Sequence, residues 1–558
     1  MHDMTRTSPA TVASRLAEAL VAQGVDHVFC VPGESYLAVL DALYDLRREI
    51  RLITCRNEIA AANMAEAYGK LTGRPGICMV TRGPGASHAA VGVHTAEQDS
   101  TPMILFVGQI ERGHRGRGAF QEVDYRQMFG SIAKWTAELE EADRVDEIVR
   151  RAFSTALNGR RGPVVLSLPE DVLTEPAVGT ALPWRAGPVR SGLEPGVLAA
   201  IGDRLRAASK PLLILGGSGW SREAAGRLAD WAEGMDLPIA LSFRRKDLID
   251  NRRPCYIGDF GLGINPRLVA RLAEADLVIA LGARLGDNPT GGYSFLDPAV
   301  TAERLVHIHP DPEELGRVWP AAIAAVADPD AAAIGLASLD GDRRWTAWRA
   351  EARADWEAFT QPVPTAGPVN LSELFGEMRA ALPDDAIVTN GAGNYAAWLH
   401  RFFPCHGFGT QLAPTSGAMG YGFPAAIAAK SIHPSREVVS VAGDGCFMMV
   451  AQELATVVQH DIPMIVVLID NGSYGTIRMH QERNFPGRTV ATDLVNPDFG
   501  ALARSFGIAS WRVEKTADFG PAFAEARASG RPALIHVLTS INDIAPGRRI
   551  ETTAASTI

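Results

Sequence analysis

The sequence predicts an α/β protein built from three doubly wound parallel sheets. Short apolar runs recur along the 558 residues and alternate with amphipathic stretches of helical period. The apolar runs are continuous, which is typical of strands buried on both faces of a parallel sheet. Segments rich in proline and glycine at residues 175–196 and 360–368 have linker composition and divide the chain into three. In such folds, ligands bind at the carboxyl ends of the strands.

Each third of the chain carries its own set of predicted strands. Residues 1–175 contain HVFCVPG, ICMVTRGPG, MILFVGQ and PVVLSLP. Residues 190–345 contain PLLILGG, DLVIALGAR and RLVHIHPD, and residues 369–545 contain AIVTNGAG, VVSVAGDG and MIVVLIDN. We therefore expect three domains, about the number that a chain of this length forms.

Composition excludes several classes of function. The net charge of −10 lacks the basic footprint of a nucleic-acid-binding protein, and no polybasic run indicates a membrane surface. No signal peptide and no long apolar stretch is apparent, so we expect neither secretion nor a membrane span. The six cysteines lack metal-type spacing and indicate reduced thiols in a cytoplasmic protein.

The most informative local pattern is a pair of turns in the last third. Residues 438–442 predict a buried strand followed by a turn at Asp444, and residues 447–459 have helical character. Residues 462–469 predict a second strand, which Asn471 follows closely. A right-handed crossover between parallel strands brings both turns to the same edge of the sheet, so the two side chains are expected to face one another.

These turns suit a magnesium ion bound to a diphosphate. The Asp444 carboxylate, the Asn471 amide oxygen and a carbonyl near Ser473 are oxygen ligands of the kind that Mg²⁺ prefers, and phosphate oxygens complete its shell. Gly443 and Gly445 allow the backbone to approach phosphates closely. The alternative is that Gly-Asp-Gly is only a turn, which the second strand ending in Asn-Gly makes the weaker interpretation.

The run from GDGCFMM to LIDNGSYG resembles the signature of thiamine diphosphate (ThDP) enzymes, in which GDG is followed by an asparagine. The resemblance implies ThDP and Mg²⁺ as cofactors. It implies as cofactor-binding residues Gly443, Asp444, Gly445, Cys446, Asn471, Ser473, Tyr474 and Gly475, with Asp444, Asn471 and Ser473 on the metal.

Such enzymes also need a carboxylate from another domain, and Glu58 is the candidate. Residues 51–54 predict a strand, Asn57 is a suitable helix cap, and Glu58 opens the stretch EIAAANMAEAYGKLTG. This run resembles the family segment whose glutamate contacts the aminopyrimidine ring of ThDP. A glutamate at a helix start also stabilises the helix dipole, which is the alternative interpretation.

Over nearly its whole length the chain resembles acetolactate synthase and its relatives. In RGAFQEVD, Phe120 and Gln121 match residues that line the substrate pocket, and Lys134 stands where related enzymes carry a lysine near the acceptor. In TSGAMGYGFP, Met419 matches the apolar wedge that holds the cofactor bent, although a methionine is otherwise core filler. The resemblance thus implies catalytic roles for Glu58, Gln121, Phe120 and Lys134.

Several positions depart from the acetolactate synthase pattern. Asn394 and Tyr395 replace a Gln-His pair in the segment that grips the diphosphate. His480 replaces a tryptophan that favours 2-oxobutanoate, and His88 replaces an asparagine. Each histidine suits carboxylate binding or proton transfer, or is a hydrogen-bonded wall residue. The candidates for the substrate pocket are Gly33, Glu34, His88 and His480.

The central third matches a flavin site only loosely. Acetolactate synthases hold a non-redox FAD there, and the loop at residues 216–219 and Arg284 are similar to its binding segments, with Asp328 as one acidic anchor. The other acidic position is His309, and GGSGWS lacks the third glycine of a dinucleotide fingerprint. FAD, ADP and no nucleotide are the open alternatives.

The resemblance implies decarboxylation of a 2-oxo acid followed by carboligation to a second carbonyl compound. The alternatives are a non-ligating decarboxylase or C–C lyase of the same family, and a non-catalytic protein of ThDP fold. A homodimer or dimer of dimers with active sites at the interface is implied. The expected partners are small molecules, without nucleic acid or membrane.

Overall fold

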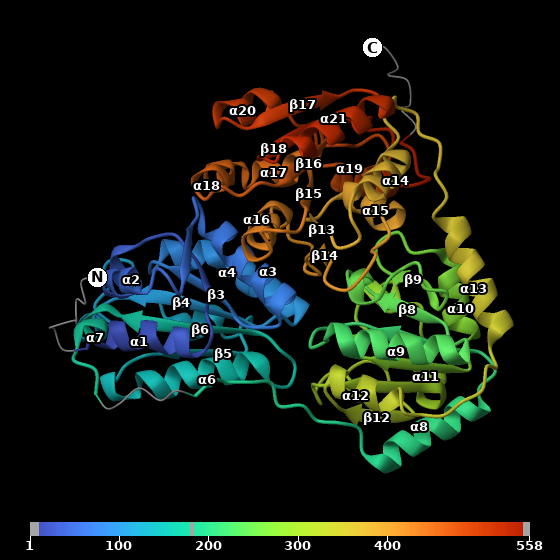
Figure 1. The fold of residues 1–558 in the computed structure, drawn as a ribbon, viewed down its shortest axis with the longest axis horizontal. Helices are drawn as coiled ribbons and strands as arrows, with labels where there is room; N and C mark the ends of the chain where they lie inside the picture. Colours follow the sequence, from blue (N-terminus) through green and yellow to red (C-terminus); the bar gives the residue numbers. More distant parts are fainter. Residues whose placement is uncertain (1–9, 179–183, 551–558) are drawn as a thin grey trace. The chain divides into compact units, whose positions relative to one another are not determined.

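The computed structural model describes residues 10–178 and 184–550 (Figure 1). Three six-stranded sheets contain every named strand, and every strand pair within them is parallel. Helices alternate with the strands along the chain. The predicted fold class, three doubly wound parallel sheets, is therefore confirmed.

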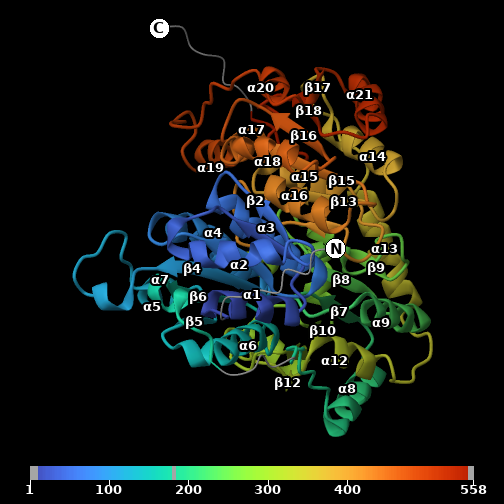
Figure 2. The ribbon, with the colours of Figure 1, turned by 60° about the vertical axis from the view of Figure 1, so that its left-hand side comes forward.

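The first sheet has the strand order β2-β1-β3-β4-β6-β5. Its strands are β1 (His27–Cys30), β2 (Arg51–Thr54), β3 (Gly76–Val80), β4 (Met103–Gln109), β5 (Trp135–Glu138) and β6 (Pro163–Pro169). Its helices are α1 (Val12–Ala22), α2 (Leu37–Asp45), α3 (Glu58–Thr72), α4 (Pro84–Asp99), α5 (Tyr125–Phe129), α6 (Val145–Leu157) and α7 (Glu170–Thr174), with 3-10 turns η1 (Glu34–Tyr36), η2 (Arg112–His114) and η3 (Ala142–Arg144). Helices α3 and α4 lie side by side (Figure 2), while α1, α2 and α6 share one apolar core with the strands.

The central sheet has the strand order β12-β11-β10-β7-β8-β9. Its strands are β7 (Pro211–Leu215), β8 (Ile239–Ser242), β9 (Tyr256–Phe260), β10 (Leu277–Leu281), β11 (Leu305–His309) and β12 (Ile323–Val326). Its helices are α8 (Pro195–Ala207), α9 (Arg222–Met235), α10 (Pro266–Glu274), α11 (Pro298–Arg304), α12 (Pro329–Leu336) and α13 (Thr346–Phe359), with η4 (Lys246–Leu248) and η5 (Asn288–Thr290). Two apolar clusters fill the space between this sheet and its helices.

The third sheet has the strand order β14-β13-β15-β16-β18-β17. Its strands are β13 (Ile387–Asn390), β14 (Gln411–Leu412), β15 (Val438–Gly443), β16 (Ile465–Asp470), β17 (Ala509–Val513) and β18 (Ala533–Leu538). The helices of this part are α14 (Leu371–Ala381), α15 (Asn394–Phe402), α16 (Gly422–Ile432), α17 (Asp444–Met448), η6 (Ala451–Glu453), α18 (Leu454–Gln459), α19 (Gly475–Asn484), α20 (Phe499–Ser505) and α21 (Thr516–Ala528). Strands β15 and β16 are buried along their whole length, as their continuous apolar sequences predict.

The chain packs into two compact bodies. Of the described residues, one body contains 10–178, 184–189 and 452–460, and the other contains 190–451 and 461–550. Helix α18 therefore packs with the first sheet, although it follows a strand of the third sheet in the sequence. Within the described ranges, no helix has the length and apolar character needed to cross a membrane.

A partly exposed charge network ties the start of β1 to α3 within the first body. The Asp26 carboxylate lies 2.7 Å from His27 Nδ1, accepts from the Tyr68 hydroxyl at 2.7 Å and accepts from the Arg74 guanidinium at 2.7 Å. Burial alone would raise the pKa of Asp26, but these hydrogen bonds outweigh it and hold the pKa well below its ordinary value. A carboxyl group whose pKa is lower in the folded chain stabilises the fold above its unfolded pKa, and this stabilisation is lost as the pH falls.

We expect Asp26→Asn to lower the melting temperature at neutral pH by roughly 2–4 °C. The amide loses the charge-assisted hydrogen bond from Arg74, which we set at about 1 kcal/mol because Asp26 is partly exposed. Below about pH 4 the wild-type carboxyl begins to lose the same advantage, so the two proteins should converge. Scanning calorimetry over a pH series tests this, and a difference that persists or grows in acid would contradict it.

Candidate active site

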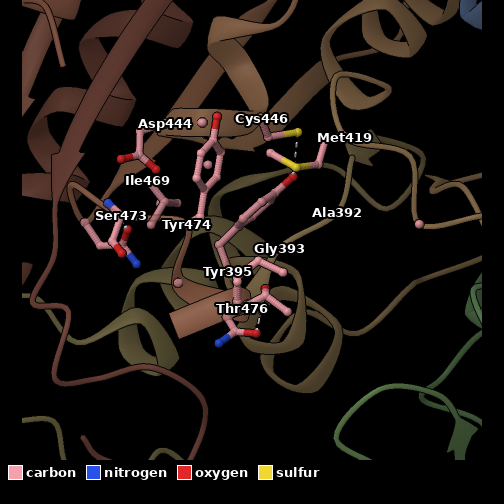
Figure 3. A pocket seen from close by; sticks show the side chains of 17 residues that line it. Ala392, Gly393, Tyr395, Met419, Asp444, Cys446, Ile469, Ser473, Tyr474 and Thr476 are labelled. Atoms are coloured by element: carbon pink, nitrogen blue, oxygen red, sulfur yellow. Dashed lines mark hydrogen bonds between the residues drawn. The ribbon is translucent and has the colours of Figure 1, made fainter. Parts of the chain in front are cut away.

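The third sheet brings two predicted ligand side chains to one edge. Strands β15 and β16 are adjacent and parallel, with Gly443 opposite Ile469 in the register. Asp444 opens α17 directly after β15, and Asn471 follows β16. Both line a cavity of about 240 Å³ (Figure 3). Every residue of the third domain that the sequence indicated as cofactor-binding lines the same cavity.

The Asp444 carboxylate belongs to a hydrogen-bond network that the sequence did not indicate. The Asn496 amide donates both to Asp444 Oδ2, at 2.8 Å, and to Asp470 Oδ1, at 2.9 Å. The other oxygen of Asp470 lies 2.9 Å from His536 Nε2 on β18. One amide therefore bridges two carboxylates that stand at the ends of neighbouring strands.

The two carboxyl groups of this network have opposite pKa shifts. Burial raises the pKa of Asp444 to about 6, and the nearby Asp470 charge adds to the effect. Burial acts in the same direction on Asp470, but hydrogen bonds from His536 and the Gly472 backbone outweigh it and lower the pKa of Asp470. Asp470 therefore ionises more readily than Asp444. A bound cation would stabilise the ionised form of Asp444.

The donor set fits a magnesium diphosphate. In the part of the chain that the structure describes, no three His, Cys, Asp or Glu side chains come together as a metal site, and Asp444 pairs with no basic side chain. Asn471 Oδ1 accepts from the Ser473 backbone at 3.1 Å, which orients the amide within its turn. One carboxylate, one amide oxygen and a backbone carbonyl leave positions of an octahedral Mg²⁺ shell for phosphate oxygens.

Two tyrosine rings shape the cavity beside the turn after β15. A Cβ atom on Gly443 would lie 2.9 Å from the Tyr395 ring, and one on Gly445 would lie 2.6 Å from the Tyr474 ring. Real Cβ atoms do not approach so closely, so both glycines make room for these rings. The sequence indicated close approach of a phosphate as the reason for the glycines, and the structure adds ring packing.

Cys446 joins the turn after β15 to the loop that carries Met419. Its sulfur accepts from the Gly420 backbone at 3.1 Å and from the Tyr395 hydroxyl at 3.5 Å. The Gly391 backbone donates to the same hydroxyl at 3.0 Å. Burial raises the pKa of Cys446 and that of Tyr395, so both groups stay protonated and act as neutral hydrogen-bonding groups.

Asn394, the first residue of α15, also contacts the neighbouring helix in the cavity wall. Its Oδ1 accepts from the Thr476 hydroxyl on α19 at 2.9 Å. Both residues line the cavity, and Thr476 was not among the residues singled out from the sequence. Its position directly after the sequence Asn-Gly-Ser-Tyr-Gly, in the first turn of α19, is a sequence feature that could have indicated it.

Glu58 stands at the carboxyl edge of the first sheet, in the other body. It follows β2 as the first residue of α3, and Asn57 caps this helix by accepting from the Ile59 backbone at 2.8 Å. Glu58 Oε2 lies 2.9 Å from Nδ1 of His88 on α4. The Glu58 side chain is 13% exposed and that of His88 is 54% exposed. His88, assigned from the sequence to the substrate pocket, therefore contacts the carboxyl group of Glu58.

Gln121 lies against the start of the same helix α4. A Cβ atom on Gly83, the N-cap of α4, would lie 2.9 Å from the Gln121 Cβ, and Gln121 itself takes a positive φ of 64°. The loop before it is held by Glu122, which accepts from the Gly116 and Ala119 backbones at 2.6 and 3.0 Å. Phe120 projects from this loop with 76% of its surface exposed.

Lys134 lies at the opposite edge of the first sheet. Its backbone donates to the Pro163 carbonyl at the beginning of β6, and its ammonium group donates to the carbonyls of Asn158 and Arg160. Glu58 and Gln121, in contrast, follow strands β2 and β4. Lys134 therefore binds backbone carbonyls at the amino edge, and this position does not support the acceptor-binding role implied by the resemblance.

The remaining candidates for the substrate pocket lie at scattered positions. His480 is exposed on α19, where its Nδ1 lies 3.0 Å from the Arg483 guanidinium, and it is not among the residues that line the cavity. Gly33 caps η1 and packs against Thr81, and Glu34 is exposed. Gly33 and Glu34 follow β1 and so share the carboxyl edge of the first sheet with Glu58.

The glycine-rich loop of the central sheet is closed by side chains of its own domain. The Trp220 indole donates to the Gly216 carbonyl at 2.8 Å, and Arg245 donates to the Gly217 carbonyl at 2.6 Å. A Cβ atom on Gly217 would lie 2.1 Å from the Gly282 carbonyl after β10. The crevice between β7 and β10, where a dinucleotide binds in this type of fold, is packed tightly at its base.

Each suggested flavin anchor also has a partner inside the chain. Arg284 pairs with Glu314 at 3.4 Å, and Asp328 caps α12. His309 Nδ1 accepts from the Asp311 backbone at 3.1 Å. These contacts connect loops of the central domain to one another, and FAD, ADP and no nucleotide stay as alternatives.

Three family descriptions match successive parts of the chain. Residues 10–128 match "Thiamine pyrophosphate enzyme, N-terminal TPP binding domain". Residues 198–336 match the central domain of the same enzymes, and residues 391–537 match their C-terminal TPP binding domain. Thiamine pyrophosphate is thiamine diphosphate under its other name.

Several relatives align with the chain over almost its full length. The acetolactate synthase large subunit of Parasynechococcus marenigrum is 32% identical over 547 residues, which cover 95% of this chain and 88% of that protein. The large subunit of acetolactate synthase isozyme 2 of Escherichia coli is 31% identical, covering 94% of this chain and 95% of its own. The putative thiamine pyrophosphate-containing protein YdaP of Bacillus subtilis is 29% identical, covering 96% and 93%.

We expect Asp444→Ala to weaken ThDP binding in the presence of Mg²⁺ by about 10–100-fold or more. Loss of a group that only orients a metal ligand costs this much, and Asp444 is the one carboxylate of the donor set. Calorimetric titration with ThDP measures the affinity. Asp518→Ala is the matched control, because Asp518 caps α21 away from the cavity and its loss should leave the affinity unchanged. Equal affinities for wild type and Asp444→Ala would contradict the assignment.

Proposed function

The chain belongs to the thiamine pyrophosphate enzyme family, and we propose that it decarboxylates a 2-oxo acid and joins the remaining fragment to a second carbonyl compound. The observation that carries this proposal is the pair Asp444 and Asn471 on one cavity, at the carboxyl edge of β15 and β16. Alignment with acetolactate synthases over almost the full length supports carboligation as the second step.

In this proposal, the cavity of the third domain holds ThDP through Mg²⁺. Asp444, Asn471 and the Ser473 carbonyl bind the metal, and the backbone of residues 443–446 faces the diphosphate. Met419 supports the cofactor from the neighbouring loop. Bound ThDP supplies a carbon nucleophile that adds to carbonyl groups and stabilises the electron pair left when carbon dioxide departs.

Glu58 acts on the aminopyrimidine ring in this proposal. Its carboxyl group holds a proton against a ring nitrogen and so assists removal of the proton at the reactive carbon. His88 Nδ1 lies 2.9 Å from Oε2 of the same carboxyl group, and this contact fixes the direction in which Glu58 presents its proton. The helix cap at Asn57 fixes the start of α3.

Gln121 and Phe120 receive the second substrate. The Gln121 amide donates a hydrogen bond to the carbonyl oxygen of the acceptor, where negative charge develops during carboligation. The exposed Phe120 ring covers the reacting group and excludes water, which favours carboligation over release of an aldehyde. Lys134 has no part in this scheme, because its ammonium group serves the opposite edge of the sheet.

We further propose that two copies of the chain complete each active site. Glu58 and the Asp444 cavity belong to different compact bodies, and family resemblance implies that they meet across a subunit interface. Large apolar side chains such as Phe120, Phe485 and Val495 are exposed in the single chain, in keeping with an uncovered interface. A homodimer or a dimer of dimers is the expected assembly.

The proposed reaction needs no flavin. The suggested anchors Arg284, Asp328 and His309 are engaged within the central domain. Decarboxylation and carboligation involve no net transfer of electrons to a second cofactor, so a flavin bound here would have no redox role. We therefore propose a central domain without bound FAD.

Incubation with ThDP, Mg²⁺ and a panel of 2-oxo acids and aldehydes tests the reaction class. We expect carbon dioxide release together with a product whose mass equals the decarboxylated donor plus the acceptor. Carbon dioxide with a free aldehyde would indicate a simple decarboxylase or lyase instead. No turnover of any pair, in protein that binds ThDP, would favour a non-catalytic member of the family.

Glu58→Gln should bind ThDP normally and exchange the cofactor's reactive C2 proton about 10²–10⁴-fold more slowly, the usual contribution of a general acid–base group. The amide keeps the size of the side chain but cannot hold or release the proton. Acid-quench NMR of deuterium incorporation measures the rate. Exchange at the wild-type rate would remove Glu58 from the mechanism.

The visible spectrum of protein purified without added flavin should lack a flavin band. Denaturation followed by chromatography of the released small molecules distinguishes FAD from ADP and from no nucleotide. Recovery of stoichiometric FAD would overturn the flavin-free central domain, and it would leave the ThDP chemistry of the proposal unaffected.

A further inference from the structure

A buried carboxylate contacts the backbone immediately before Glu58. Glu453 is the last residue of η6 and is fully buried. It packs in the first body, with residues 452–460. Its two carboxylate oxygens accept from the Arg56 backbone at 3.1 and 3.2 Å, and the Asn57 backbone also donates to it. Arg56 and Asn57 are the last two residues before α3 begins.

Glu453 can be buried as a carboxylate only if the backbone of Arg56 and Asn57 takes the conformation that donates to it. The Thr456 hydroxyl donates to Oε2 at 2.5 Å, and the other donors are the backbone groups of Arg56 and Asn57. Burial raises the pKa of Glu453, while these hydrogen bonds oppose the rise. A buried carboxylate is costly unless its oxygens are hydrogen-bonded. Arg56 and Asn57 are therefore held in the one conformation that satisfies Glu453.

Helix α18 and its C-cap His460 make further contacts with the same segment. The Thr54 backbone at the end of β2 donates to His460 Nε2 at 3.0 Å, and Arg51 donates to the His460 carbonyl at 3.0 Å. The Arg56 guanidinium donates to Gln459 Oε1 at 2.8 Å. The segment from β2 to α3 is thus anchored to residues 453–460 at several positions.

We propose that Glu453 is a positioning residue for Glu58. It fixes the backbone of Arg56 and Asn57, so that the first residue of α3 presents its carboxyl group from one defined place. The Asn57 cap is part of the start of α3, so it cannot fix the position of α3 relative to other elements. Glu453 belongs to a separate element and can do so. This inference rests on the proposed function of Glu58.

Glu453→Gln tests the inference with two readouts. In cofactor-free protein, mass-spectrometric amide exchange should become faster in the segment 54–59 and stay unchanged in the central domain. In protein loaded with ThDP and Mg²⁺, C2 proton exchange should slow by about 10–100-fold, the effect of a small misplacement of a reacting group. ThDP affinity should be unchanged, because Asp444 and Asn471 are intact. Added to Glu58→Gln, the change should slow exchange no further, since both act through one carboxyl group.

Glu66→Gln is the matched control within the same helix. Glu66 is also fully buried, and it accepts from the Thr101 hydroxyl at 2.7 Å, further along α3. This substitution should lower the melting temperature without changing C2 exchange or amide exchange at residues 54–59. If Glu453→Gln does not fold, Glu453→Asp keeps the charge with a shorter side chain and should give intermediate effects in both readouts.

The outcomes separate the inference from the function on which it rests. Wild-type C2 exchange in Glu453→Gln or Glu453→Asp, with slow exchange in Glu58→Gln, would overturn the positioning role alone. Additive slowing in the double variant would show a general structural role and would also overturn it. Wild-type exchange in Glu58→Gln would instead refute the proposed role of Glu58.

Discussion

The parallel pairing of β15 with β16 is the constraint on which the site depends. Because Gly443 stands opposite Ile469, the turns that follow the two strands open at one edge. The ligand side chains therefore come from positions 444 and 471, where the backbone has just left the sheet. The cost of this arrangement is electrostatic, since burial raises the pKa of Asp444 in a cavity without a basic side chain among its lining residues. A bound divalent cation would remove that cost.

Strand ends could be predicted from the sequence because each lies directly after a continuous apolar run. This local signal located Asp444, Asn471 and Glu58 at carboxyl edges of their sheets. Asn496 and His536 had no such signal, because they reach Asp470 from 26 and 66 residues away along the chain. Their contacts depend on how loops and β18 return to the same edge, which periodicity does not reveal.

For Lys134, the similarity of sequence and the structure point to different roles. The residue type suited an acceptor site, but in the structure Lys134 directly precedes β5, and residues before parallel strands lie at the amino edge. Strand direction therefore separates it from Gln121, which follows β4. The short and largely polar β5 was not predicted from the sequence. The central domain gives a similar lesson. Its glycine-rich loop resembles a nucleotide loop, yet the Trp220 and Arg245 side chains already bind its carbonyls.

The division of the chain into two bodies has a consequence for biosynthesis. The first body includes residues 452–460, and its contact between Arg56 and Glu453 spans 397 positions of sequence. During synthesis, the strands of the first sheet leave the ribosome long before residues 452–460 have been made. Until most of the chain has emerged, the backbone donors of the loop from β2 to α3 are hydrated and do not yet bind Glu453. Contacts of such long sequence separation form late and slowly, so the N-terminal part acquires its final form only after the cavity of the third sheet has begun to be synthesised.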